Sequence, residues 1–177
     1  VLVFKNLGVD IQDGSGNTVW SSNGGLATLL IDATKKFVLQ LSGTNLCLDT
    51  GNGTITKNAD GTVTGNNKAW MFNCDGNNNN QQLSYTPSDQ RMKFSNGLYL
   101  DSSNNNQLYG NSKQGPNQTW NFDFVLNKLY NPNVPGTCVD AAGNGILESG
   151  NSNEYIYNNG NCDSVKNNNQ KWNLLYN

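Results

Sequence analysis

Hydrophobic residues in this chain occur in short runs separated by stretches rich in Gly and Asn. Short runs of this kind, partly alternating and bounded by Gly and Asn, are typical of strands. No stretch carries the 3.6-residue period of an amphipathic helix. Asn and Gly accept the left-handed backbone conformations of tight turns, so their abundance fits short strands joined by turns. The pattern predicts an all-β protein.

Three segments of the chain share one order of features. Each has an apolar strand end that finishes in Asp, then an aromatic strand, then Asn-Gln followed two residues later by Leu or Trp. The strand ends are 45–49, 97–101 and 136–140; the aromatic strands are 70–74, 107–110 and 155–157; the closures are 80–83, 117–120 and 169–172. Such a repeat determines the fold. Four short strands per repeat, three times over, predict a closed barrel capped by hairpins, because closure removes exposed sheet edges.

This order of features resembles the ricin B-type lectin family, whose hallmark is Gln-x-Trp once per repeat. Residues 118–120 and 170–172 match this motif in full, and residues 81–83 match with Leu in place of Trp. One Gln-x-Trp arises often by chance, whereas three Asn-Gln closures downstream of apolar-Asp ends are specific together. The resemblance covers about residues 36–177 and implies a β-trefoil with repeats at about 36–88, 89–127 and 128–177. It also implies a lectin module that is not an enzyme and binds galactose or N-acetylgalactosamine glycans, one site per repeat.

A sugar ring offers a C–H face for stacking on an aromatic side chain and hydroxyls for planar polar groups. An ionised Asp accepts two hydroxyl hydrogen bonds at once, and an Asn both donates and accepts. By the resemblance, the Asp of each repeat accepts hydroxyls, the aromatic residue stacks, and the Asn-Gln pair completes the site. The implied sites are Asp49, Trp70, Phe72, Asn80 and Gln81; Asp101, Gln107, Tyr109, Asn117 and Gln118; and Asp140, Tyr157, Asn169 and Gln170.

Several of these roles have alternatives. Phe72 and Tyr109 are each eight residues before the Asn of their closure, but in the third repeat the interval from Tyr157 is twelve. Tyr155 is therefore an alternative platform, or the third site is inactive. Each closure Gln is either a sugar contact or a structural hydrogen-bonding group, and each Asp is either a ligand or a turn cap. Three closure residues are expected in the core: Leu83, Trp120 and Trp172.

The four cysteines are widely spaced, and the chain has no Cys-x-x-Cys pair and no His. This argues against a metal site and favours disulfides formed in an oxidising compartment. Spacing alone leaves three pairings open. The family pattern places a bridge within a repeat, which implies Cys47–Cys74 and Cys138–Cys162. Tyr99 stands where the second repeat would have its first Cys.

Charge and composition exclude several classes of function. The net charge is −2, and no run of Lys or Arg offers a surface for nucleic acid or anionic membranes. No apolar stretch approaches the roughly 20 residues of a membrane span. Without His or a Gly-x-Ser-x-Gly motif, and with the repeated Asp residues spread round a barrel, an enzyme is disfavoured and no cofactor is expected.

Residues 1–35 lie outside the three repeats. Residues 8–13 and 17–23 resemble one hairpin of a bulb-type lectin repeat. The simpler interpretation is a β-hairpin extension packed on the trefoil, or the remnant of a preceding domain. The start at Val1 instead of Met suggests a mature or trimmed chain. The even number of widely spaced cysteines in an Asn-rich chain predicts a protein that is secreted or displayed at the cell surface. Asn52 and Asn117 are in glycosylation sequons, and a glycan on Asn117 would cover the second site.

Two other functions fit a trefoil. One is a protein-binding module such as a protease inhibitor, whose long loop would be residues 51–68 with Lys57 and Lys68. The other is the sugar-targeting module of a larger secreted enzyme. Loss of binding on mutation of Asp49 and Asp101 distinguishes the lectin from the inhibitor.

Overall fold

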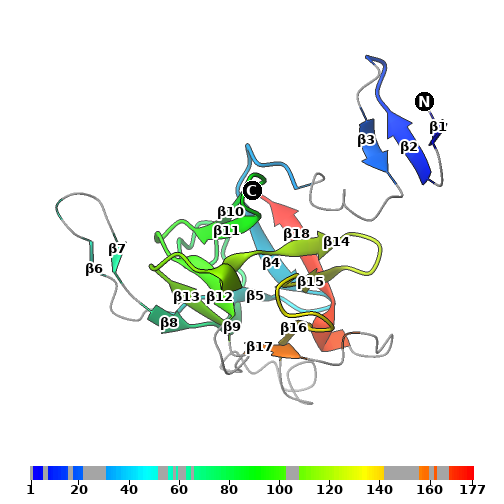
Figure 1. Ribbon diagram of the computed structural model, residues 1–177. Coiled ribbons are helices and arrows are strands. Elements are labelled where there is room, and N and C mark those ends of the chain that lie inside the picture. Colours follow the sequence, from blue (N-terminus) through cyan, green and yellow to red (C-terminus); the bar gives the residue numbers. More distant parts are fainter. Residues whose placement is uncertain are drawn as a thin grey trace.

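The structure is a computed structural model that describes residues 2–5, 8–15, 18–21, 31–51, 56–57, 59, 63–64, 66–102, 108–141, 156–159, 162 and 168–177. Within these residues the chain consists of strands, turns and two single 3-10 turns (Figure 1). The strands outside the repeats are β1 (Leu2–Lys5), β2 (Gly8–Gln12) and β3 (Thr18–Ser21). The first repeat has β4 (Phe37–Leu41), β5 (Leu46–Asp49), β6 (Thr56–Lys57), β7 (Val63–Thr64), β8 (Asn66–Lys68), β9 (Trp70–Asn73) and β10 (Leu83–Thr86). The second and third have β11 (Arg91–Phe94), β12 (Tyr99–Ser102), β13 (Leu108–Asn111), η2 (Pro116–Gln118), β14 (Asn121–Asp123), β15 (Lys128–Tyr130), β16 (Cys138–Ala141), β17 (Ile156–Asn159), η3 (Asn168–Gln170) and β18 (Trp172–Tyr176).

The barrel is built from the first and last strands of the three repeats. The last strand of each repeat pairs with the first strand of the next, so β10 pairs with β11 and β14 with β15. β18 pairs with β4 over five positions, from Trp172 opposite Leu41 to Tyr176 opposite Phe37. This last pairing joins the end of the chain to its first barrel strand and closes the ring. The prediction of an all-β trefoil is confirmed.

The two middle strands of each repeat form the hairpins of the cap. β5 pairs with β9, β12 with β13, and β16 with β17, each over four positions. In all three hairpins an Asp stands in the first strand and an aromatic residue opposite it in the second. The threefold repetition of the sequence is therefore a threefold repetition of hairpins.

The barrel interior holds the residues of the Gln-x-Trp closures. Leu83, Trp120 and Trp172 are fully buried, as expected. The indole Nε1 of Trp120 donates to the Leu100 carbonyl at 2.8 Å, and that of Trp172 donates to the Val139 carbonyl at 3.0 Å. A buried indole N–H without a partner would be costly, so each Trp is held against the cap hairpin of its own repeat.

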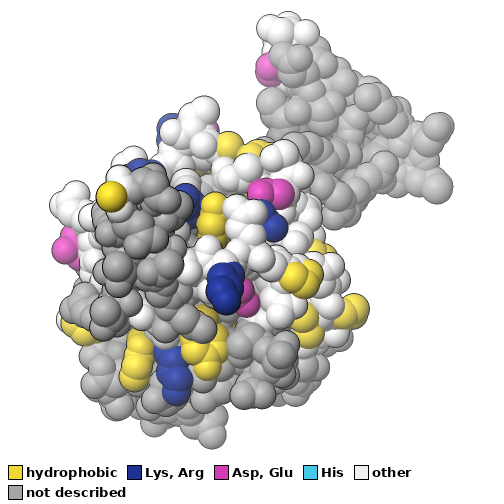
Figure 2. All heavy atoms as spheres, turned by 60° about the vertical axis from the view of Figure 1, so that its left-hand side comes forward, with side chains coloured by type: hydrophobic (Ala, Val, Ile, Leu, Met, Phe, Trp, Pro, Cys, Tyr) yellow, Lys and Arg dark blue, Asp and Glu magenta, His cyan; other side chains and the backbone are white. Residues whose placement is uncertain are grey.

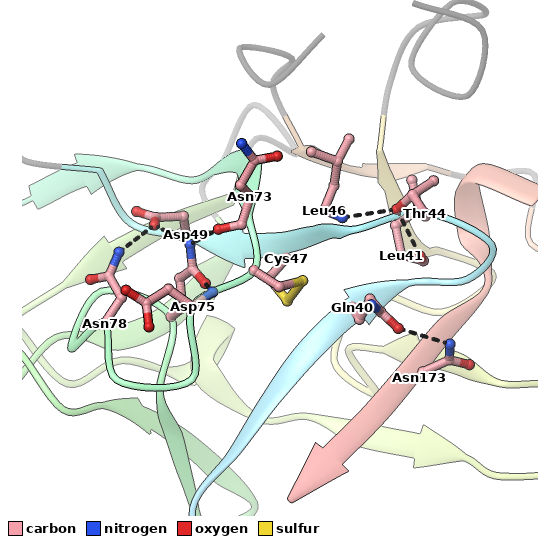
Figure 3. Close-up of a disulfide and its surroundings, with 12 residues drawn as sticks. Gln40, Leu41, Thr44, Leu46, Cys47, Asp49, Asn73, Asp75, Asn78 and Asn173 are labelled. Atoms are coloured by element: carbon pink, nitrogen blue, oxygen red, sulfur yellow. Dashed lines mark hydrogen bonds between the residues drawn. A yellow bond between two sulfur atoms is a disulfide. The ribbon is translucent and has the colours of Figure 1, made fainter. Parts of the chain in front are cut away.

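Two disulfides link cap strands to the loops that follow them. The pairs are Cys47–Cys74 and Cys138–Cys162, as predicted, and Figure 3 shows the surroundings of Cys47. With sequence separations of 27 and 24 residues, the loss of entropy in the unfolded chain makes each bridge worth about 3–4 kcal/mol. In the second repeat, the Tyr99 hydroxyl accepts from Gln114 Nε2 at 3.3 Å, and Gln114 Oε1 accepts from Arg91 Nη1 at 3.0 Å. These hydrogen bonds hold the corresponding loop without a covalent bond.

Two segments differ from the sequence analysis. The N-terminal segment is a three-stranded sheet of order β1-β2-β3, where a single hairpin was expected. Among the described residues its strands pair only with one another; the boundary near residue 35 stays a prediction. Residues 51–68 were expected to be a long loop, but Asn66–Lys68 form the strand β8, which pairs with β13 of the second repeat. β6 and β7 pair with each other.

Candidate functional site

One hydrogen bond recurs in all three repeats. The closure Gln donates from Nε2 to Oδ2 of the repeated Asp. The pairs are Gln81–Asp49 at 2.9 Å, Gln118–Asp101 at 2.7 Å and Gln170–Asp140 at 2.8 Å. The three Gln side chains are fully buried, and the three Asp residues are 4%, 8% and 4% exposed. The Gln residues therefore orient the carboxylates from inside the protein and present no surface to a ligand.

The carboxylate of the first repeat is engaged on both oxygens. Oδ1 of Asp49 accepts from the backbone N–H of Gly51. Oδ2 accepts from Gln81 and, at 3.3 Å, from Nδ2 of Asn78 (Figure 3). Gln81 is fixed in turn, because its Nε2 also donates to the Asn73 carbonyl and its Oε1 accepts from the Asp75 N–H at 2.8 Å. Asp49 thus has much of its acceptor capacity used within the protein.

The carboxylate of the second repeat is less occupied. Oδ2 of Asp101 accepts from Gln118 and, at 3.2 Å, from Nδ2 of Asn111. From the part of the chain that the structure describes, Oδ1 of Asp101 receives no hydrogen bond. A charged oxygen without an internal donor at the end of a cap strand is suited to accept hydrogen bonds from ligand hydroxyls.

The strand register places one aromatic residue opposite each Asp. Trp70 lies opposite Asp49, Tyr109 opposite Asp101 and Tyr157 opposite Asp140. The twelve-residue interval after Tyr157 thus reflects a longer loop and not a displaced strand position. The side chain of Tyr157 and the whole of Tyr155 and Gln107 lie outside the described residues.

The register corrects one equivalence drawn from spacing. Counting back from the closures made Phe72 the counterpart of Tyr109, but the counterpart in the hairpin is Trp70, because the loop after β9 is longer. Phe72 lies opposite Cys47, on the same face of β9 as Trp70, and is 50% exposed. Trp70 is partly buried; a Cβ on Gly51 would lie 3.3 Å from its Nε1, so the indole edge lies against that turn. The first repeat therefore presents two aromatic side chains beside its Asp.

The closure Asn residues connect successive repeats. Oδ1 of Asn80 accepts from Nδ2 of Asn96 at 3.0 Å, and the Asn117 carbonyl accepts from Nδ2 of Asn131 at 2.9 Å. Both donors are buried and belong to the following repeat. Asn169 is partly buried. Asn80 and Asn117 thus help to hold the sites together, a role that the sequence analysis did not assign to them.

Four further Asn residues support the sites and were missed. Asn78 and Asn111 donate to the repeated Asp, while Asn96 and Asn131 donate to the closures. In a chain so rich in Asn, composition did not single them out. The available signal was positional, since Asn96 and Asn131 each stand in the turn after the first strand of a repeat.

Other classes of site are not visible. The described residues hold no group of three or more His, Cys, Asp or Glu side chains placed to bind a metal ion. In that same part of the chain, no helix has the length and apolar character needed to cross a membrane.

The sequence of the chain also matches the model of a known protein family. Residues 35–172 match the model of the ricin-type beta-trefoil lectin domain. The chain belongs to this family. Ricin-type lectin domains bind carbohydrate, so the family supports glycan binding by the chain.

Solved structures show the same fold at low identity. The C-half of the earthworm R-type lectin, in complex with GalNAc, has a TM-score of 0.60 and 13% identity, over 81% of this chain and 99% of that one. The β-trefoil lectin of the Vibrio vulnificus hemolysin/cytolysin, with N-acetyl-D-lactosamine bound, has a TM-score of 0.55 and 21% identity, over 80% and 94%. GalNAc-T7 with UDP, GalNAc and Mn2+ has a TM-score of 0.57 and 16% identity, over 79% of this chain and 22% of that one. No curated protein sequence matches the chain.

Proposed function

We propose that this ricin-type trefoil is a lectin module for galactose or N-acetylgalactosamine glycans, with Asp101 of the second repeat at its principal site. The observation that carries the proposal is the buried Gln-to-Asp hydrogen bond, made three times with the same atoms. A carboxylate that is held in one orientation beside an aromatic residue can accept hydrogen bonds from sugar hydroxyls without first having to be ordered. The ligands of the earthworm and Vibrio lectins, GalNAc and N-acetyl-D-lactosamine, support this sugar class.

The second site is ranked first because of its hydrogen bonds. Oδ1 of Asp101 accepts hydroxyls, and Tyr109, on the facing strand, supplies a ring for the C–H face of the sugar. At Asp49 a ligand hydroxyl competes with Gly51, Asn78 and Gln81 for the same carboxylate. A surface site of this kind gives single-site dissociation constants near the millimolar range, about −4 kcal/mol. Additional sites on the same rigid barrel raise avidity on clustered glycans.

The proposal includes a non-catalytic, extracellular role. The two disulfides and the lectin family support an oxidising environment. In the described part of the chain the repeated carboxylates contact amides and not one another, an arrangement without a general acid and base pair. A related role is the sugar-targeting module of a larger protein. The match to GalNAc-T7, which covers 22% of that longer chain, supports this related role.

Titration with lactose and N-acetylgalactosamine tests the proposal. Asp101→Asn keeps the shape and an oxygen for Gln118 but removes the charge. The loss of charge-assisted hydrogen bonds should weaken binding by roughly ten- to a hundredfold. Asp49→Asn is the matched control and should change affinity less. Competition by free galactose and binding to a glycan array give independent readouts.

The opposite result is equally clear. Folded, disulfide-bonded protein that binds no glycan, or binds equally well in both variants, contradicts the proposal. Proteinase inhibition that survives both substitutions would instead support a protein-binding trefoil.

A further inference from the structure

Residues 66–73 form one extended segment that lies against two repeats. β8 pairs with β13 of the second repeat, with Lys68 opposite Tyr109. The Ala69 N–H then donates to the Leu108 carbonyl at 2.9 Å, and β9 continues along β5 of the first repeat. The insertion in the first repeat therefore ends as a strand that connects the first site to the second.

Side chains along this segment alternate between the interior and solvent. Asn67, Ala69 and Met71 are buried, whereas Lys68 and Phe72 are exposed and Trp70 is partly exposed. Because side chains of a strand alternate between its faces, Lys68, Trp70 and Phe72 lie on one face. Their successive Cα atoms are about 7 Å apart along the strand. A cation and two aromatic rings thus line the outer surface between the two sites.

The second site gains a cation through the same pairing. Asp101 lies opposite Tyr109 across β12 and β13, and Tyr109 lies opposite Lys68 across β13 and β8. Directly opposed residues on neighbouring strands have their Cβ atoms about 5 Å apart. Tyr109 therefore stands between an anionic residue on one side and a cationic residue on the other. Figure 2 brings the β8 side of the molecule forward and shows Lys and Arg side chains among hydrophobic ones.

We propose that the first and second sites form one continuous surface for galactose-type glycans with an acidic substituent, and that Lys68 binds the acidic group. The inference rests on the proposed lectin function and names its ligand class. A sugar on Tyr109 with hydroxyls at Asp101 directs its opposite edge toward β8. A sulfate or carboxylate there meets the Lys68 ammonium, and hydrogen bonds from an ammonium to an anionic oxygen are stronger than those between neutral groups. In the reverse orientation the acidic substituent of the sugar would lie beside the Asp101 carboxylate, and the two anions would repel each other. The arrangement therefore also fixes the direction in which the ligand binds.

Three probes test the inference on the full chain. They are lactose, lactose sulfated on its galactose, and 6'-sialyllactose; the last two distinguish sulfate from carboxylate. The wild-type protein should bind one or both acidic probes roughly three- to tenfold more tightly than lactose at low salt. This preference should shrink as ionic strength rises, because salt screens exposed charges.

Substitutions assign the preference to one side chain. Lys68→Gln should abolish it and leave lactose affinity unchanged, while Lys68→Arg should retain it. Lys93→Gln is the matched control: Lys93 is an exposed residue of β11 whose ammonium lies 5.1 Å from the Tyr99 ring centre, so the variant loses the same charge elsewhere. It should behave as the wild type.

The outcomes separate the two proposals. If lactose binds without any preference for the acidic probes, or if Lys68→Gln keeps the preference, the inference is wrong and the lectin function stands. An equal loss for all three probes in Lys68→Gln also overturns it, because Lys68 then only positions Tyr109. If no probe binds the folded protein, the lectin function itself fails.

Discussion

At the scale of single residues, the buried glutamines connect stability to recognition. Gln118 donates to Asp101 and to the Lys113 carbonyl, so Gln118→Met leaves a buried carboxylate with one donor fewer and a carbonyl without its partner. We expect a loss of about 1–3 kcal/mol in the free energy of unfolding. Galactoside affinity should fall as well, because Asp101 is no longer oriented. Urea denaturation and lactose titration measure the two effects.

Gln81→Met supplies the comparison in the first repeat. Gln81 makes the equivalent bond to Asp49, which Asn78 and Gly51 also hold. Stability should fall by a similar amount while second-site binding is retained. Equal losses of affinity in the two variants would mean that the glutamines act on binding only through global stability.

Residue identity was easier to predict than residue position. The Asp residues, the core Trp residues and the disulfide pairs follow from the repeat and its family resemblance. The strand position equivalent to Tyr109 in the first repeat did not, because spacing was counted from the closure, and the loops between hairpin and closure differ in length among the repeats. The strand register, which decides that Trp70 and not Phe72 opposes Asp49, is set by pairing that sequence spacing does not show.

At the scale of elements, β13 depends on a glycine. A Cβ on Gly110 would lie 2.7 Å from Cγ2 of Thr50 and 2.8 Å from Cδ1 of Leu98. Gly110→Ala must therefore push β13 away from the core or displace these side chains. Overpacking of this kind costs about 1–3 kcal/mol in the free energy of unfolding. The shift should also weaken lactose binding, because Tyr109 is the adjacent residue.

Gly115→Ala is the control for this substitution. Nothing lies within 4 Å of a Cβ at Gly115, and its φ of −155° is accessible to any residue. Its melting temperature should stay close to that of the wild type. A Gly110→Ala variant of unchanged stability would show that Thr50 and Leu98 can move aside at little cost.

The strand β8 shows where element prediction reached its limit. Residues 51–68 are rich in Gly, Asn and Thr and lack an apolar alternation, so they were expected to be a loop. β8 is a strand because β13 offers it an edge, a tertiary cause that the composition of the segment does not encode.

At the scale of the molecule, barrel closure rests on the last strand. Removing residues 173–177 deletes most of β18, frees the edge of β4 and exposes core side chains, so we expect an unfolded protein by circular dichroism. Removing residues 1–30 should leave the melting temperature within a few degrees, because β1, β2 and β3 pair with one another and Ile31 of the core is retained. A large loss from the second deletion would place the domain boundary earlier in the chain.

The second repeat keeps its loop in place with Tyr99, Gln114 and Arg91, whereas a disulfide is present in each of the other two. Thiol reductants therefore act on the repeats unequally. They release the loops next to Asp49 and Asp140 and leave the surroundings of Asp101 chemically unchanged. In the lectin that we propose, with one site in each repeat, reduction would then lower the number of working sites before it affected binding at Asp101. A protein able to cross-link glycans would become one that holds a single glycan at a time.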